Sequence, residues 1–366
     1  MQRPRTARFL LPALIPVLLT GSACSNGPTG PGGTGWTLET IAVGPRLGYH
    51  SSVTVAEDGT VHAAYHDAHN LRLFHARRAV PGGWISTPID TVGWMGEGVQ
   101  IAAGAGDTLH LVYKDIFPDD LKYARFAGGE WQYERFDIYQ SGGEDPHLFL
   151  APDGIHVLEL NEERSAVNYW RNTAGEWENL AYLSFGTSRT SFAFCQGPAG
   201  PEVAIFAKRT SWRSSSWQIE HRRAETPGGT WVRSTLLEGL KTEDFYHLSL
   251  AMGYDLSDHR HVLYRNGNGR LIDLALGRAI DSQVPKSRVA ISHDDAGTLW
   301  ILYARESSLV LAAYSEPAAR WERRAVLGNI APAGRWGFAI DPGGAVHATV
   351  YSSSGRLWYA RWEDPE

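Results

Sequence analysis

Between Tyr49 and Trp84 the chain alternates short apolar runs with polar turns. SSVTVA, VHAAY and LRLFHARR are rich in β-branched, aliphatic or aromatic residues, and the turns EDGT and HDAHN separate them. The turn PGG then leads into a fourth run, WISTPID. Runs of this kind, bounded by Gly, Pro, Asn and Asp, are typical of strands joined by hairpins. The stretch therefore predicts four short antiparallel strands.

The same unit recurs along the chain, and tryptophans mark the start of its fourth strand. These tryptophans are Trp36, Trp84, Trp131, Trp177, Trp231 and Trp321. Their intervals are 48, 47, 46, 54 and 90 residues, and the last interval holds two units because LALGRAIDSQV near Ile280 replaces one tryptophan turn. Four-stranded repeats of about 40–50 residues are typical of propeller blades. We predict an all-β fold, a seven-bladed β-propeller of four-stranded antiparallel blades that occupies residues 36–366 as one domain.

The two ends of this body complement each other. WTLETIAV at residues 36–43 is a fourth strand with no inner strands before it, and LWYARWEDPE at the end is a third strand with no fourth after it. We expect the N-terminal strand to pair around residues 357–362 and complete the last blade. Closure of this kind removes the free edge strands that a linear array would expose.

The residues before the repeats predict export. Residues 1–23 begin with three arginines, continue with an apolar run over residues 9–20, and end with small residues before Cys24. This run is short enough for a signal peptide and too short for a membrane span. Cys24 resembles the acylated cysteine of bacterial lipoproteins, and Ser25 after it implies outer-membrane sorting. The alternative is cleavage by ordinary signal peptidase, which gives a periplasmic or extracellular protein. Residues 24–35, rich in Gly and Pro, then form a flexible linker.

Charge and cysteine content exclude some classes of protein. Three of the 34 basic residues lie in the leader, which leaves 31 against 40 acidic residues, a charge of about −9. This balance argues against nucleic-acid binding. Cys195 has no partner in the folded body, so we expect an inert buried thiol and no internal disulfide. We also expect a monomer.

Histidines recur at one position of the second strands. They are His62, His110, His156, His261 and His347. One histidine per blade inside packed strands is spread around the ring, so a metal or catalytic cluster is the weaker interpretation. We predict that these imidazoles are neutral, buried, and hydrogen-bonded to a neighbouring strand.

The loops on the two faces differ in character. The turns between strands one and two and between strands three and four are short and monotonous, whereas the remaining connections are longer, charged and variable. Rigid scaffolds usually carry function on variable loops, so the second face is the candidate site.

Basic and aromatic residues gather in these variable loops. The cations near the ends of the second strands are Lys114, Lys208, Arg209, Arg265 and Arg305, and those that precede the first strands are Arg46, Arg189, Lys241, Arg288 and Arg335. Arginine suits carboxylate or sulfate, and aromatic faces suit sugar rings. We therefore predict an anionic-ligand site that contains Lys114, Lys208, Arg209, Arg265 and Arg305 with Trp94, Trp212 and Trp336. The alternative is that acids on the same face, such as Glu144 and Asp145, pair with the cations.

Candidate catalytic groups lie where the first strands begin. Tyr49 and His50 form one pair, and Tyr246 and His247 form another. A tyrosine or histidine there could transfer a proton while arginines neutralise a uronate carboxylate. His147 beside Asp145 is a further candidate, and His50, His147 and His247 could instead converge on a metal. No nucleophile-elbow, Walker or zincin motif is present in the sequence, so we assign no cofactor, no metal and no definite reaction.

The phrases YHDAHNLRLFHA, YKDIFPDDLKYARF and YSSSGRLWYARW resemble the repeats of secreted bacterial propellers in the sialidase-like (BNR-type) group. The resemblance covers the framework of residues 36–366, because the Gly and Trp of the sialidase Asp-box remain while its Ser and Asp do not. It implies polysaccharide lyases and glycosidases of acidic glycans as relatives. Two functions are consistent with these observations. The first is a surface lipoprotein that binds an acidic carbohydrate, either with or without cleaving it. The alternative is a non-catalytic propeller that docks a protein partner of the bacterial envelope.

Overall fold

The computed structural model describes residues 35–79, 83–90, 95–117, 120–137, 142–185, 191–210, 215–240, 249–285 and 288–364, with the backbone alone at 95, 137, 208–210 and 215. The predicted signal peptide and Cys24 lie outside these residues. The described chain forms 28 strands. Within it, no helix has the length and apolar character that crossing a membrane requires.

Five sets of four consecutive strands each form one antiparallel sheet within the described residues. The first three are β6 (Met95–Ala103), β7 (Leu109–Asp115), β8 (Asp120–Ala127) and β9 (Glu130–Asp137); β10 (Glu144–Ala151), β11 (Gly154–Asn161), β12 (Ala166–Thr173) and β13 (Glu176–Ser184); and β14 (Phe192–Gly197), β15 (Gly200–Thr210), β16 (Ser215–Arg223) and β17 (Val232–Leu240). The other two are β18 (Leu250–Tyr254), β19 (Arg260–Arg265), β20 (Leu271–Asp273) and β21 (Arg278–Asp281); and β22 (Val289–His293), β23 (Leu299–Arg305), β24 (Ser308–Ser315) and β25 (Arg320–Leu327).

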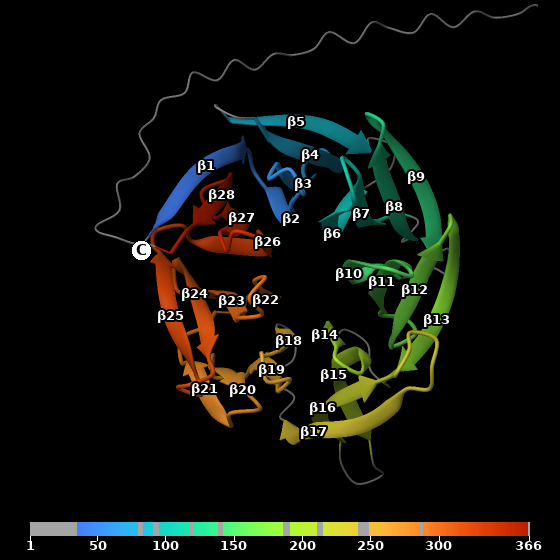
Figure 1. Cartoon of the computed structure of the whole chain (residues 1–366), viewed down its shortest axis with the longest axis vertical. Helices are drawn as coiled ribbons and strands as arrows, with labels where there is room; N and C mark the ends of the chain where they lie inside the picture. Colours follow the sequence, from blue (N-terminus) through green and yellow to red (C-terminus); the bar gives the residue numbers. More distant parts are fainter. Residues whose placement is uncertain are drawn as a thin grey trace, which may run out of the picture. The chain divides into compact units, whose positions relative to one another are not determined.

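The remaining strands form one eight-stranded sheet that consists of two such meanders. One meander is β2 (Leu47–Val55), β3 (Val61–Asp67), β4 (Arg72–Ala79) and β5 (Gly83–Asp90); the other is β26 (Pro332–Ile340), β27 (Val346–Ser352), β28 (Arg356–Trp362) and β1 (Trp36–Val43). The two are joined by the parallel pairing of His50 with Arg335. The first strand of each meander lies nearest the central axis, as Figure 1 shows. The predicted all-β fold of four-stranded antiparallel repeats is confirmed.

The N-terminal strand completes the last meander, as the sequence predicts. β1 pairs antiparallel with β28, from Trp36 opposite Trp362 to Val43 opposite Arg356. Because the first strand of the body supplies the outer strand of the last sheet, the two ends of residues 36–362 are held together. The ring is thereby closed by backbone hydrogen bonds.

Burial follows the position of each strand in its sheet. The second strands β3, β7 and β27 are buried at every position because neighbouring sheets cover both of their faces. Their sequences are therefore continuous apolar runs instead of alternating ones. The outer strand β5, by contrast, exposes four consecutive residues. The core consequently lies between adjacent sheets, and it requires no disulfide.

The repeated histidines of the second strands are framework residues, as predicted. His110, His156 and His347 each place Nδ1 at 2.7–3.0 Å from the hydroxyl of a tyrosine on the third strand of the same sheet. The Nδ1 atom of His62 lies 2.9 Å from Nε2 of His75. Burial lowers the pKa of His62 and of His110 to about 4, so both rings are neutral at pH 7.

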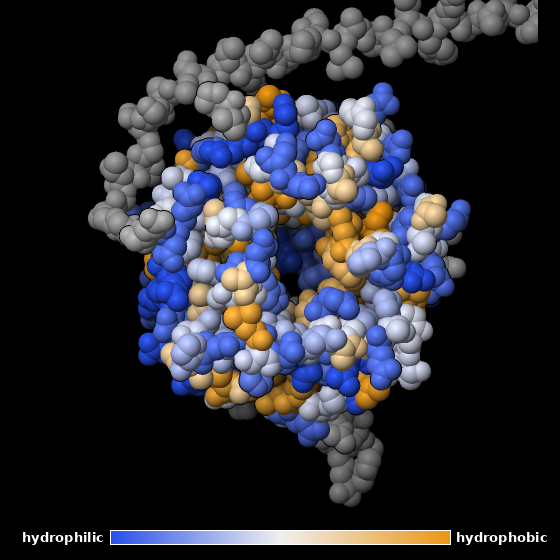
Figure 2. Space-filling model, viewed as in Figure 1, coloured by the Kyte–Doolittle hydropathy of each residue, from blue (hydrophilic) through white to orange (hydrophobic). Residues whose placement is uncertain are grey.

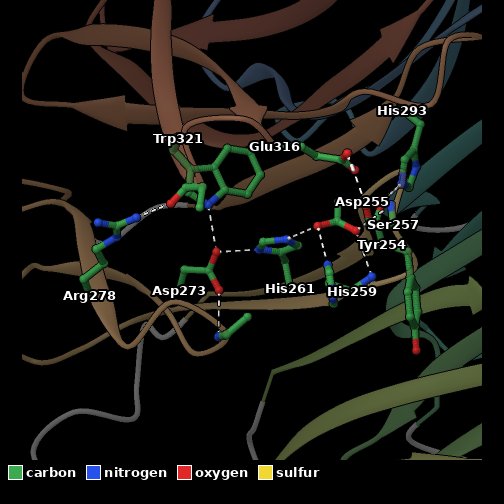
Figure 3. Close-up of polar contacts among 12 residues, drawn as sticks. Tyr254, Asp255, Ser257, His259, His261, Asp273, Arg278, His293, Glu316 and Trp321 are labelled. Carbon is green, nitrogen blue, oxygen red and sulfur yellow. Dashed lines mark hydrogen bonds and ion pairs between the residues drawn. The ribbon is translucent and has the colours of Figure 1, made fainter.

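His261 departs from this pattern. Asp273 stands where the sheets of His110, His156 and His347 have tyrosine, and its Oδ2 lies 2.6 Å from Nδ1 of His261. On the other side of the ring, Oδ2 of Asp255 lies 3.3 Å from Nε2, as Figure 3 shows. Burial opposes the charged imidazolium, but the bonds to Asp273 and Asp255 outweigh burial and raise the pKa of His261. Asp273 also accepts a hydrogen bond of 2.8 Å from Nε1 of Trp321 in β25, so this charge network joins two adjacent sheets.

The His261 network predicts a pH-dependent stability. A raised folded-state pKa gives a contribution that is complete below about pH 6.5, the usual unfolded value, and is lost as pH rises through the folded value. We expect Asp273→Asn to cost roughly 3 kcal/mol near pH 6, because it removes the nearer of the two carboxylates that pair with the buried imidazolium of His261. The cost should shrink toward pH 9. Thermal melting of both proteins across this range measures it, and a cost that does not change with pH would exclude a charged His261.

Ring closure predicts a large effect of deleting β1. Removal of residues 36–43 exposes the edge of β28 and the apolar contacts beneath it, and should lower the melting temperature by roughly 10 °C or more. Deletion of residues 25–34 is the matched control and should leave the melting temperature unchanged. Equal melting temperatures for the two deletions would show that the β1–β28 pairing does not hold the ring.

Candidate functional site

A cavity of about 690 Å³ lies on the axis of the ring and is walled mainly by the innermost strands. It forms the central hollow of the face that Figure 2 shows. Its volume falls in the range of about 300–1,000 Å³ that is typical of small-molecule sites. The cavity is open at this face, and every four-stranded meander of the described chain contributes residues to its wall.

The cavity wall changes character along the strands. Near the starts of the strands the wall includes Asp145, Arg288 and Arg335, together with His147. Further along, it includes Phe194, Met252, Ile291 and Phe338. The charged end belongs to the face with the variable loops, because the loops that enter the first strands lie there. We call Arg288, Arg335, Asp145, His147 and His50 the channel-mouth cluster.

Two glycines place Arg335 at the axis. Gly334 has a φ of +73°, and a Cβ on it would lie 2.0 Å from the backbone oxygen of Tyr49. A Cβ on Gly337 would lie 2.5 Å from the backbone nitrogen of Val53. β26 therefore approaches β2 closely where Arg335 stands. Because side chains alternate along a strand, Arg335 reaches the cavity while Trp336, 1% exposed, enters the core.

Arg335 and Asp145 form an ion pair at the channel mouth. Nη1 of Arg335 lies 2.5 Å from Oδ1 of Asp145, and the side chains are 33% and 17% exposed. Burial alone would raise the pKa of Asp145, but the charges of Arg335 and Arg288 outweigh burial and lower it. Asp145 is consequently ionised at pH 7.

Arg288 has a different environment from Arg335. It immediately precedes β22, lines the cavity, and forms no hydrogen bond or ion pair with any described residue. Burial and, to a lesser extent, the charge of Arg335 lower its pKa, while Asp145 acts in the opposite direction. An arginine remains protonated despite such a shift. Among the described residues, a guanidinium without a hydrogen-bond or ion-pair partner therefore accompanies one that is already paired.

The two histidines of the cluster are neutral at pH 7. Burial, followed by the charge of Arg335, lowers the pKa of His50, and the backbone N–H of Gly98 donates to its Nδ1 at 3.0 Å. Burial lowers the pKa of His147 to about 4 despite the nearby Asp145. Nε2 of His147 is buried without a hydrogen-bond partner in the described part of the chain. Neutral imidazoles of this kind can accept or relay a proton.

The metal alternative receives no support from the described residues. No group of three or more His, Cys, Asp or Glu side chains among them has an arrangement that could hold a metal ion. His247, the third histidine of that alternative, lies outside the described residues, as does its neighbour Tyr246.

Three predicted ligand-binding cations do not line the cavity, which corrects their expected position. Lys114 is 8% exposed and forms an ion pair with Glu144. Arg265 is buried and donates from Nε to the carbonyl of Val284 at 2.7 Å. Arg305 donates to Gln283 at 3.0 Å. Nε of Arg305 also lies 3.6 Å from Oδ2 of Asp281, which forms an ion pair. The pairing with acids that the sequence left open therefore holds for Lys114 and Arg305, whereas Arg265 donates to backbone carbonyls.

The other predicted site residues have varied outcomes. Trp336 belongs to the core between two sheets, so its ring offers no stacking surface to a ligand. Tyr49 is 37% exposed, and its ring centroid lies 5.5 Å from that of His50 at the strand entry where the sequence places both. Trp94, Trp212 and the side chains of Lys208 and Arg209 lie outside the described residues.

The position of each cation within its sheet explains why Lys114, Arg265 and Arg305 do not line the cavity. Lys114, Arg265 and Arg305 end second strands, one strand away from the axis. Arg288 and Arg335, by contrast, stand at or near the starts of first strands, which wall the cavity. Both groups of cations can be identified in the sequence. Whether a cation lies near the start of a first strand or at the end of a second strand is the signal that distinguishes the cavity residues from the others.

Comparisons with known proteins show similarity of fold. No family model matches the chain, and no curated protein matches its sequence. The polysaccharide lyase Uly1 superposes with a TM-score of 0.54 at 10% identity over 89% of this chain and 91% of that chain. The α-L-arabinofuranosidase Arb93A from Fusarium graminearum gives 0.52 at 9% identity over 91% and 98%. The WD40 domain of Toxoplasma gondii coronin gives 0.54 at 11% identity over 91% and 87%. These similarities support a propeller framework, without distinguishing the sialidase-like group within it.

Proposed function

We propose that this chain is a seven-bladed propeller whose channel-mouth cluster binds an acidic carbohydrate. The observation that carries the proposal is Arg288, a protonated side chain with no hydrogen bond or ion pair to any described residue, on the wall of an axial cavity. The count of seven takes the eight-stranded sheet as two blades, since its halves are joined by a single residue pair.

The charge balance at the channel mouth favours an anion. Arg288 and Arg335 carry two positive charges, and Asp145 supplies one negative charge directly to Arg335. His50 and His147 are neutral at pH 7 because burial lowers their pKa. Glu162 also lines the cavity but has a partner of its own. A carboxylate or sulfate would give Arg288 the paired hydrogen bonds that its geometry suits.

Three further features favour a carbohydrate as the carrier of that anion. The cavity, of about 690 Å³, is large enough for a sugar, and the polar residues Ser52 and Gln100 belong to its wall. Tyr49 offers a half-exposed aromatic ring beside the entry. Among the similar folds, a polysaccharide lyase and an arabinofuranosidase act on carbohydrates by name. Cleavage, as a further part of the proposal, would use His50 or His147 for proton transfer.

A protein-docking function has less support. The exposed large apolar side chains of the described residues include Val43, Ile85, Tyr133, Tyr182 and Val232. These five lie on the outer strands β1, β5, β9, β13 and β17, one on each of five meanders. These five are therefore distributed around the rim, and the other exposed large apolar residues of the described chain, Tyr49, Phe117 and Leu256, belong to three different meanders. A docking surface, by contrast, needs a contiguous apolar patch.

Substitution of Arg288 tests the proposed site. Arg288→Gln should weaken binding of an oligogalacturonate about ten-fold or more, because charge-assisted hydrogen bonds contribute roughly 1.5–3 kcal/mol each. Calorimetric titration with the acidic oligosaccharide and with its neutral methyl ester measures the effect. The matched control is Arg125→Gln, since Arg125 is exposed and has no hydrogen-bond or ion-pair partner in the described residues.

The outcomes separate clearly. If both variants bind like the parent, or if the methyl ester binds as tightly as the acid, the channel mouth is not an anion site. Binding that weakens equally in both variants would indicate general surface electrostatics, which also contradicts the proposal.

We further propose that the mature protein is lipidated at Cys24 and tethered by residues 25–35 to the outer membrane. A cysteine directly after a signal peptide and before a flexible segment supports this location. Cys24→Ala should move the protein from the detergent phase to the aqueous phase in a phase-partition assay. Unchanged partitioning would show that Cys24 carries no anchor.

A further inference from the structure

The ion pair between Arg335 and Asp145 crosses the central channel. Arg335 lies on β26 and Asp145 on β10, and 190 positions of sequence separate them. β26 packs against β2 and β22, whereas β10 packs against β6. The meanders β2–β5 and β6–β9 lie between them on one side of the ring, as Figure 1 shows. The contact between Arg335 and Asp145 is therefore made across the cavity, and it does not result from the packing of neighbouring strands.

Asp145 lies at an irregular position of its own sheet. It lies where the register between β10 and β11 is interrupted, between Glu144 and His147. Its φ of +45° lies in the left-handed region, which a residue other than glycine adopts at some energetic cost. Arg335 is its hydrogen-bond partner among the described residues. Such a bulged and strained position is typical of functional sites, where it redirects a side chain.

Without a ligand, Arg335 needs a counter-charge. An arginine drawn into a channel loses part of its hydration, and an unpaired charge there is costly. Asp145 supplies this charge from the opposite wall. Arg288 has no such partner among the described residues, so within that part of the chain the charge of Asp145 acts on two guanidinium groups.

We infer that Asp145 is an internal competitor that occupies, in the unliganded channel, the place of the ligand's anionic group on Arg335. On binding, the carboxylate or sulfate of the ligand replaces Asp145 and is held by Arg335 and Arg288 together. This inference rests on the proposed function and adds how the site selects its ligand. A neutral sugar cannot replace the charge of Asp145, so the exchange rejects uncharged chains.

The inference predicts that removal of an acid from the wall strengthens binding. Asp145→Asn should bind oligogalacturonate several-fold more tightly than the parent, while binding of the neutral methyl ester should not improve. Asparagine tolerates the left-handed region, so the backbone at this position should be preserved. Asp145→Gly is the second variant, because glycine adopts a positive φ without strain and also removes the carboxylate. Glu130→Gln, at an exposed position, controls for the change of net charge.

The results distinguish this inference from the proposed function. If Arg288→Gln weakens binding and Asp145→Asn also weakens it or leaves it unchanged, the anion site stands and the competition is refuted. If Arg288→Gln has no effect, the proposed function itself fails. Tighter binding in Asp145→Asn and Asp145→Gly, with no gain in Glu130→Gln, supports the exchange. An equal gain in Glu130→Gln would assign the effect to net charge and overturn it.

Discussion

The pairing of β1 with β28 is the constraint on which the remaining structure depends. It joins the beginning and the end of the folded body through backbone hydrogen bonds, so that the sheets form a ring. In a closed ring every first strand faces the same axis, and residues that are distant in sequence become neighbours. His50, Asp145, Arg288 and Arg335 come from four different meanders and meet at one mouth for this reason. The chemistry of the site is a consequence of closure.

The mouth combines two cations, one competing acid and two neutral histidines. Burial disfavours the charged form of all three titratable groups. It leaves His50 and His147 neutral, whereas the charges of Arg335 and Arg288 outweigh burial at Asp145 and keep it ionised. In the inference drawn above, the mouth acts as an ion-exchange site in which the protein itself supplies the anion, Asp145, that pairs with Arg335. The framework histidines show the same dependence on neighbours in a structural role, since Asp273, at the place where three other sheets have tyrosine, raises the pKa of His261 and so favours its charged form.

The sequence predicts the fold well because the repeat places every strand relative to the next. The tryptophans, the Gly-rich turns and the split last meander are all local signals, and the structure confirms the strand pattern and the β1–β28 pairing. The site is predicted less well. Arg265 and Arg288 are equally good candidates in the sequence. In the structure, Arg265 donates a hydrogen bond to the carbonyl of Val284, whereas Arg288 lines the cavity. That difference depends on which strand lies nearest the axis, and on side-chain partners that no spacing reveals. Trp336 is a similar case, because alternation along β26 sends it into the core while Arg335 reaches the channel.

The most direct measurement of the central claim is a crystal structure of the protein with a short oligogalacturonate bound. The account predicts a carboxylate of the ligand within hydrogen-bonding distance of both Arg288 and Arg335, on the axis of the ring, with Asp145 turned away from Arg335. A ligand bound to the outer strands or to the face with the short turns, with the Arg335–Asp145 pair intact, would contradict it.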